Sequence, residues 1–196
     1  MSATLVEAPA STRSASMPLL TGALLATVGS LGYIALNSLP PREASLHPVG
    51  VGSAAVTTIG CLLLGMGLLQ WRTPLPRWAV VAAATGVWFA GATAWALSTF
   101  VVAAARGTTN AHFDALFFNS PWVLGGMAVK SLLCFPALLG LAIAGWRQRS
   151  IPRVAALALG LAALLSLWPP YPPGLIVTAI ACGLIARPRR AGALSG

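Results

Sequence analysis

Residues 119–146 read N-S-P-W-V-L-G-G-M-A-V-K-S-L-L-C-F-P-A-L-L-G-L-A-I-A-G-W, an almost wholly apolar stretch that contains Lys130, the only lysine of the chain. Ser120 is suited to cap a helix, and Pro121 fits the first helical turn, where its missing N–H costs no hydrogen bond. Lys130 follows nine residues later, roughly 14 Å along a helix, near the middle of a hydrocarbon core about 30 Å thick. The stretch therefore predicts a membrane-spanning helix with one charge near its centre.

The composition of the chain excludes an ordinary soluble domain. Hydrophobic residues make up 57% of the sequence and charged residues 8%, and the mean hydropathy is +0.82. Soluble domains contain about 25% charged residues, so this composition indicates an all-α integral membrane protein. The net charge of +9 comes mainly from arginines between apolar segments, which is typical of topology signals rather than of a nucleic-acid surface. We therefore expect no nucleic-acid partner.

Polar or proline-rich loops divide the apolar sequence into segments of helical length. We predict a bundle of six transmembrane helices, at about residues 18–39, 48–71, 78–105, 120–146, 154–168 and 174–187. Residues 1–17 are small and polar and are predicted to form a disordered cytoplasmic tail, and residues 188–196 a basic cytoplasmic tail. Residues 106–120 hold a short aromatic run between polar residues, which favours an interfacial or re-entrant turn.

Arginines are distributed unequally between the two sides that this topology defines. Nine of the eleven arginines fall on the side of the amino terminus, and only Arg42 and Arg106 fall on the opposite side. Because arginine and lysine accumulate in cytoplasmic loops, the distribution predicts that both termini are cytoplasmic. We expect a multi-pass protein of the plasma membrane, in contact with membrane lipid.

Small residues recur every four residues in two of the predicted helices, which is typical of faces where membrane helices approach closely. The first helix carries Gly22, Ala26 and Ser30. The third carries a longer row, which we expect to form the closest contact of the bundle: Ala82, Gly86, Ala90, Ala94 and Ser98.

Motifs for nucleotide hydrolysis, dinucleotide binding, zinc proteolysis and serine hydrolysis do not occur in the sequence. The three cysteines lie on different predicted helices, where we interpret them as packing residues. Both histidines lie outside the predicted spans, which disfavours a haem held between two histidines inside the bundle. We predict no catalytic residue, no metal site and no cofactor.

Five side chains form a candidate ligand-binding set: Glu43, His47, His112 and Asp114 on the predicted outer side, and Lys130 in the membrane. A carboxylate beside an imidazole is able to act as a general base or to bind a metal, whereas isolated loop residues are simply solvated. Lys130 also has two interpretations. Its ammonium either extends outward to Asp114, Glu43 or an anionic headgroup, or binds an anionic substrate within the membrane.

One segment carries a resemblance to a known family. Residues 28–43 read V-G-S-L-G-Y-I-A-L-N-S-L-P-P-R-E, and the following predicted helix ends G-M-G-L-L-Q-W-R at Arg72. This hairpin resembles the amino-terminal hairpin of actinobacterial polyprenol-phosphate-mannose-dependent mannosyltransferases of the GT-C type. The resemblance implies an envelope-assembly setting, with Glu43 as the analogue of a loop carboxylate. Those enzymes are much longer, and their acidic, tyrosine-rich outer loop has no counterpart in this sequence.

Three functions remain open at this point. The scarcity of ionisable groups and the abundance of small residues favour a non-catalytic subunit or accessory partner of an envelope membrane complex, joined to a protein partner or to its own copies. The second is a small transporter or lipid-handling protein with an anion site at Lys130. The third is a GT-C-related enzyme that uses Glu43, His112 and Asp114 at the outer face.

Overall fold

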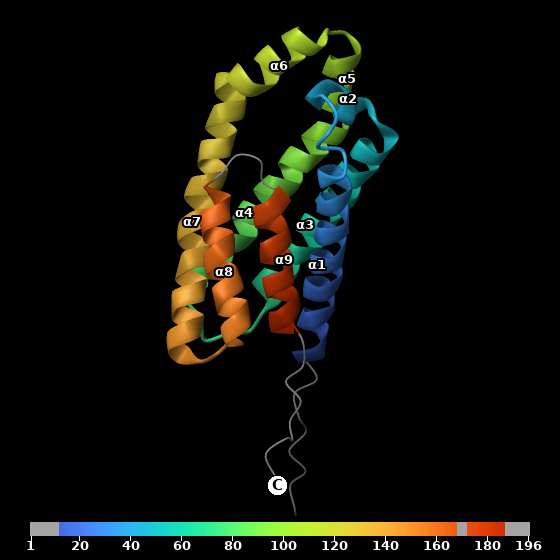
Figure 1. Cartoon of the computed structure of the whole chain (residues 1–196). Coiled ribbons are helices and arrows are strands. Elements are labelled where there is room, and N and C mark those ends of the chain that lie inside the picture. Colours follow the sequence, from blue (N-terminus) through green and yellow to red (C-terminus); the bar gives the residue numbers. More distant parts are fainter. Residues whose placement is uncertain (1–11, 168–171, 187–196) are drawn as a thin grey trace, which may run out of the picture.

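The computed structural model describes residues 12–167 and 172–186, and every regular element in these ranges is an α-helix (Figure 1). The all-α class expected from the sequence is therefore confirmed for the described residues. The helices in chain order are α1 (Thr12–Ile34), α2 (Pro41–Leu46), α3 (Pro48–Gln70), α4 (Arg77–Ser98), α5 (Phe100–Arg106), α6 (Asn110–Asn119), α7 (Pro121–Gln148), α8 (Arg153–Ser166) and α9 (Pro172–Ala186).

Prolines mark where several helices begin. The helices α2, α3 and α7 carry Pro41, Pro48 and Pro121 in their first turns. Proline is favourable there because its fixed φ angle is already helical and its missing N–H belongs to the turn that has no intrahelical partner. The same residue type that interrupts the apolar pattern in the sequence therefore sets the amino ends of these helices.

Four helical segments are long and apolar enough to cross a membrane, which marks the chain as an integral membrane protein: Met17–Ile34, Pro48–Gln70, Arg77–Arg106 and Val123–Gln148. The last two helices are shorter. With 14 residues in α8 and 15 in α9, they are roughly 21 to 23 Å long, against a hydrocarbon core of about 30 Å. Helix length thus separates α8 and α9 from the other apolar helices.

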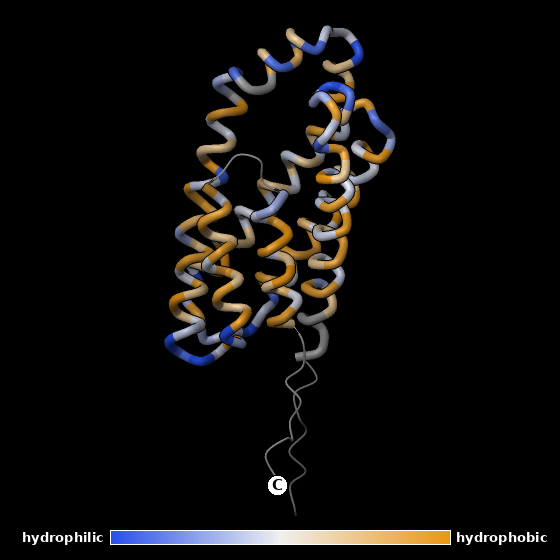
Figure 2. The backbone as a smooth tube through the Cα atoms, in the orientation of Figure 1, coloured by the Kyte–Doolittle hydropathy of each residue, from blue (hydrophilic) through white to orange (hydrophobic). Residues whose placement is uncertain are grey.

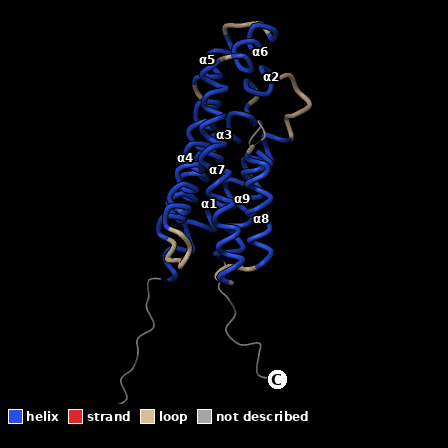
Figure 3. The backbone as a smooth tube through the Cα atoms, turned by 90° about the vertical axis from the view of Figure 1, so that its left-hand side faces the viewer, coloured by secondary structure: helices blue, strands red, loops and turns tan. Residues whose placement is uncertain are grey.

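The long helices lie side by side, and hydrophilic residues gather mainly at the two ends of the bundle (Figures 1 and 2). One end holds the start of α1, the α3–α4 and α7–α8 connections and the end of α9. We call it the arginine-rich end, for Arg72, Arg77, Arg147, Arg149 and Arg153. The other end, the α6 end, holds α2, α5 and α6, and α8 and α9 do not reach its level (Figure 1). A side view shows the loops gathered near the same two ends (Figure 3).

Several predicted boundaries differ from the structure. Helix α1 begins at Thr12 and ends at Ile34, so residues 12–17, expected in a disordered tail, are helical. Residues 1–11 and 188–196 lie outside the described residues. Residues 110–119 form a regular helix, α6, whose N-cap Thr109 accepts a hydrogen bond through Oγ1 from the His112 N–H at 3.4 Å. A capping threonine therefore organises the connection that was expected to be a turn.

The third predicted helix is interrupted. It divides at Thr99, whose φ of −123° and ψ of −81° are not helical, into α4 and α5. The hydroxyls of Ser98 and Thr99 both donate to the Trp95 carbonyl oxygen, each at 2.8 Å. Such side-chain bonds compete with the backbone ladder and bend helices, which explains the break.

The closest packing in the bundle joins α1 to α3. A Cβ added to Gly22 would lie 2.8 Å from the Leu64 Cα, and one added to Gly60 would lie 2.8 Å from the Ala26 Cα. These are contacts between helix backbones, and they leave no room for a side chain. The expectation that the row on α4 forms the closest contact is therefore wrong.

The α4 row packs against side chains instead. A Cβ on Gly86 would lie 2.5 Å from the Cys134 Sγ of α7, and Ala90 and Ala94 are buried. Ala82, in contrast, is partly exposed. In α1, Ala26 and Ser30 are buried together with Gly22. Both rows thus lie mostly at helix contacts, but with different partners and at different depths.

We expect Gly60→Ala to lower the stability of the bundle by about 1–3 kcal/mol, because the new methyl group would overlap the α1 backbone. Gly52→Ala is the matched control on the same helix, since no atom lies within 4 Å of its added Cβ. Thermal unfolding of the purified protein in detergent, followed by circular dichroism, checks both variants. Equal midpoints for the two would show that α1 and α3 are not in backbone contact.

Candidate functional site

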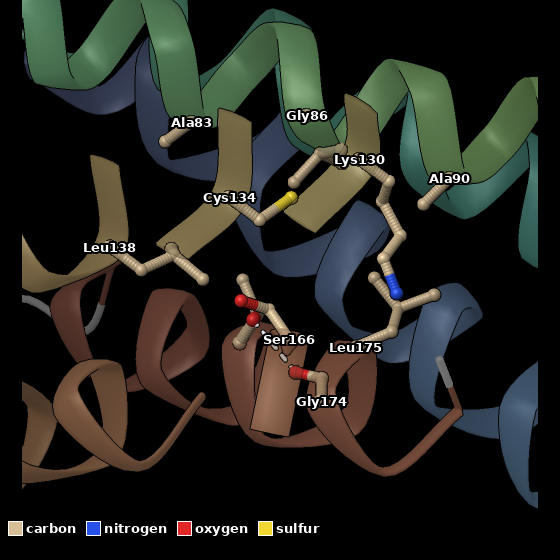
Figure 4. Close-up of a pocket in the computed structure, with 11 residues that line it drawn as sticks. Ala83, Gly86, Ala90, Lys130, Cys134, Leu138, Ser166, Gly174 and Leu175 are labelled. Atoms are coloured by element: carbon tan, nitrogen blue, oxygen red, sulfur yellow. Dashed lines mark hydrogen bonds between the residues drawn. The ribbon is translucent and has the colours of Figure 1, made fainter. Parts of the chain in front are cut away.

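Lys130 lies on the interior face of α7 and is only 7% exposed. The same face continues toward the arginine-rich end through Ala137, Leu138 and Leu141, which are all buried. Figure 4 shows the lysine side chain extended past Ala90 of α4, with its ammonium beside Leu175 of α9. The only lysine of the chain is therefore directed into an apolar part of the bundle.

A small cavity of about 30 Å³ lies beside Lys130, between α4, α7, α8 and α9 (Figure 4). It is lined mainly by apolar and small residues: Ala83, Gly86, Val87, Ala90, Lys130, Cys134, Leu138, Ser166, Gly174, Leu175 and Thr178. Since a water molecule needs about 10–15 Å³ of such space, the cavity has room for roughly two water-sized groups. It is therefore large enough for a small polar group and too small for a lipid headgroup.

The hydroxyl groups around the cavity donate their hydrogens to backbone carbonyls. Ser166 Oγ donates to the Ala163 oxygen at 2.6 Å, and Thr178 Oγ1 donates to the Gly174 oxygen at 2.8 Å. Ser131, the neighbour of Lys130, donates to the Ser166 oxygen at 2.8 Å and so connects α7 to α8. These bonds stabilise the helices and supply no negative charge to the site.

No counter-charge meets the Lys130 ammonium within the described part of the chain. No carboxylate lines the cavity, and the lysine makes no hydrogen bond or ion pair to a described residue. A charged lysine at the centre of a membrane helix costs about 2.5–3.5 kcal/mol on insertion scales, so an ammonium without a partner is unfavourable here. Among the residues that the structure describes, the site is a cation that lacks an anion.

The outer-side residues of the candidate set gather at the α6 end but form a structural contact. The Arg42 guanidinium donates through Nε to the Ala105 carbonyl oxygen at 2.8 Å and through Nη1 to the Asn110 Oδ1 at 3.4 Å. Asn110 Nδ2 donates in turn to the Glu43 Oε1 at 3.5 Å. This network joins α2 to α5 and α6, and Glu43 takes part in it as a hydrogen-bond acceptor.

The histidines and Asp114 do not complete a catalytic or metal site in the structure. His47 caps α3, where its Nδ1 accepts a hydrogen bond from the Val49 N–H at 3.2 Å. His112 is exposed, and the buried Oδ1 of Asp114 has no hydrogen-bond partner among the described residues. Among the residues that the structure describes, no three His, Cys, Asp or Glu side chains lie close enough to hold a metal ion.

The structure does not join Lys130 to the acids of the α6 end. No ion pair connects it to Glu43 or Asp114, although all three residues are described. Comparisons with protein-family models, with curated proteins and with solved structures found no match to this chain. The function therefore has to be derived from the arrangement of its own residues.

One further feature borders the site. We call residues 121–129 the open segment of α7, because none of its residues with a described side chain is buried. Leu124 is 52% exposed, and an added Cβ on Gly125 or Gly126 would have no atom within 4 Å. Gly126 and Met127 precede Lys130 by four and three residues, so they lie on its face of the helix. The core-facing row of α7 thus continues beyond Lys130 through partly buried residues, and no described atom lies within 4 Å of a Cβ added to Gly126.

Sequence reasoning found Lys130 but missed most of its surroundings. The available signal was Cys134, which follows the lysine by four residues and so shares its helix face. Contributions from α4, α8 and α9 depend on how the helices pack, and no local pattern reveals them. The role of Arg42 and Asn110 at the α6 end was missed for the same reason.

Proposed function

We propose that this chain is a non-catalytic subunit of a larger membrane complex, and that the open segment of α7 is where another subunit packs. The observation that carries the proposal is the continuation of a core-facing row, through Met127 and Gly126, into a segment where no described atom lies within 4 Å of a Cβ added to Gly125 or Gly126. Apolar exposure alone is ordinary in a membrane, because lipid is as apolar as leucine. Two adjacent glycines on the open segment are more informative, since small residues allow another helix to approach closely.

The short helices α8 and α9 support the same proposal. Helices of roughly 21 to 23 Å cross a bilayer only where it thins or where other protein covers their ends. They also stop below the level of the α6 end (Figure 1), and Ser166 at the end of α8 bonds to Ser131, just after the open segment of α7. A partner helix packed along α7 would fill the space that longer versions of α8 and α9 would otherwise occupy.

We further propose six transmembrane segments with both termini in the cytoplasm. The positive-inside rule supports this orientation. Among the arginines that the structure describes, five lie at the arginine-rich end and two, Arg42 and Arg106, lie at the α6 end. The start of α1 and the end of α9 share the arginine-rich end. A plasma-membrane, cell-envelope setting is the part of the proposal that rests on the resemblance of residues 28–72 to mannosyltransferase hairpins.

An anion site at Lys130 is the second candidate, and the cavity beside the lysine favours it. Its volume of about 30 Å³ suits contact with one small anionic group better than passage of a solute or storage of a lipid. We therefore treat the anion contact as part of the subunit function. An outer-face enzyme receives less support, because Glu43 and His47 serve as structural contacts.

The orientation is tested by labelling single cysteines with a membrane-impermeant maleimide. Gly107→Cys, between α5 and α6, is expected to react in intact cells, and Arg149→Cys only after the membrane is permeabilised. The unchanged chain, in which Cys61 and Cys182 are buried and Cys134 is half-buried, provides the background measurement. Labelling of Arg149→Cys in intact cells would reverse the proposed orientation.

The subunit proposal is tested by purifying the tagged chain from its native membrane in mild detergent. We expect a stoichiometric partner chain with the wild type and at least about fivefold less of it with Gly126→Leu, because the larger side chain blocks close helix approach. Gly52→Leu is the matched control on α3, where an added Cβ also meets no atom, and it should retain the partner. Both variants should unfold at the wild-type temperature. A wild-type chain that purifies alone would refute the proposal.

A further inference from the structure

We infer that Lys130 pairs with a carboxylate carried by a transmembrane helix of the partner subunit. The inference rests on the proposed function and names the chemistry of the partner at the same site. Its first support is that Lys130 is 7% exposed, faces the cavity and has no counter-charge among the described residues. Basic side chains within membrane segments are retained where a partner or a polar cavity compensates them, so this lysine calls for an anion from outside the chain.

The size of the cavity favours a helix-borne carboxylate over a lipid headgroup. Lys130 lies roughly 14 Å along α7 from Pro121 and roughly 26 Å from Arg147, so it belongs to the half of the helix nearer the α6 end. The neighbouring cavity admits roughly two water-sized groups. An aspartate or glutamate tip fits this space, and a phosphodiester with its substituents does not.

The open segment of α7 provides the path by which such a helix reaches the lysine. Gly126 and Met127 share the face of Lys130, and no atom lies within 4 Å of an added Cβ on Gly126. A helix packed against these residues shares the face of α7 from which the Lys130 side chain extends. Membrane helices associate through small residues that permit close packing and through polar side chains that bond across the contact. Gly126 and Lys130 supply these two features on one face of α7.

A second copy of this chain does not supply the missing charge. The sequence contains only three acidic residues, Glu7, Glu43 and Asp114. None of them lies within the four apolar segments that are long enough to cross a membrane. Glu43 and Asp114 belong to α2 and α6 at the α6 end, so a symmetric pair of copies would leave both lysines unpaired. The partner is therefore a different chain.

The single lysine allows a direct chemical test. Dicyclohexylcarbodiimide enters membranes and activates buried carboxylates, and the Lys130 amine then attacks the activated acyl carbon. An amide bond forms, and dicyclohexylurea leaves. Applied to native membranes that contain the tagged wild-type chain, the reagent is expected to give a covalent heterodimer whose linked peptides join Lys130 to an aspartate or glutamate in an apolar segment of another protein. Lys130→Arg keeps the positive charge but lacks the amine, so this product should disappear.

A second measurement separates this inference from the subunit proposal. Lys130→Met should unfold at or above the wild-type temperature, because an unpaired ammonium is replaced by an apolar chain of similar length. It should also recover at least about tenfold less partner, because the partner carboxylate then stays unpaired. Full partner recovery with Lys130→Met would overturn the inference and leave the subunit proposal intact. A link from Lys130 to Glu43, to Asp114 or to a lipid, or anionic phospholipid retained only when Lys130 is present, would also overturn it.

Discussion

Helix length within the bilayer is the constraint on which the rest of this structure depends. A chain inside lipid must satisfy its backbone hydrogen bonds within helices, so the number of residues in each helix fixes how far it reaches. The segments Pro48–Gln70 and Val123–Gln148 are long enough to cross, whereas α8 and α9 have 14 and 15 residues. Helix α8 ends at Ser166, whose carbonyl oxygen accepts a hydrogen bond from Ser131, so its contact with α7 ends beside Lys130. The end of the α8 contact and the buried Lys130 therefore lie at the same level of α7.

The two parts of the bundle are held by different kinds of contact. Helices α1 and α3 meet backbone to backbone at Gly22 and Gly60, and Thr58 of α3 joins α4 through a 3.2 Å bond to the Gly91 carbonyl oxygen. The open segment of α7 has no comparable contact among the described residues, although its glycines would permit one. This segment is therefore the part of the bundle at which we propose that another membrane protein packs.

The sequence predicted the helical class, the proline-marked helix starts and the charge within residues 119–146, because each of these depends on local composition. It did not predict the break at Thr99, which results from two hydroxyl groups bonding the same carbonyl. It placed the closest packing on α4, because four-residue spacing identifies small residues but not the helix they meet. The cavity was also beyond local patterns, since Lys130, Ala90 and Leu175 come from separate helices. The sequence therefore allowed us to predict which side chains share a helix face, but not which helices are in contact.

The central claim is that the open segment of α7 is covered by another protein in the native membrane. The most direct measurement is the oxygen accessibility of a nitroxide spin label at Gly126→Cys, in a chain whose native cysteines are replaced by alanine. Accessibility should be high in the purified chain reconstituted in lipid and should fall severalfold in the complex isolated from native membranes, while a label at Gly52→Cys stays unchanged. A label at residue 126 that is already shielded in the purified chain, or equally accessible in both samples, would contradict the claim.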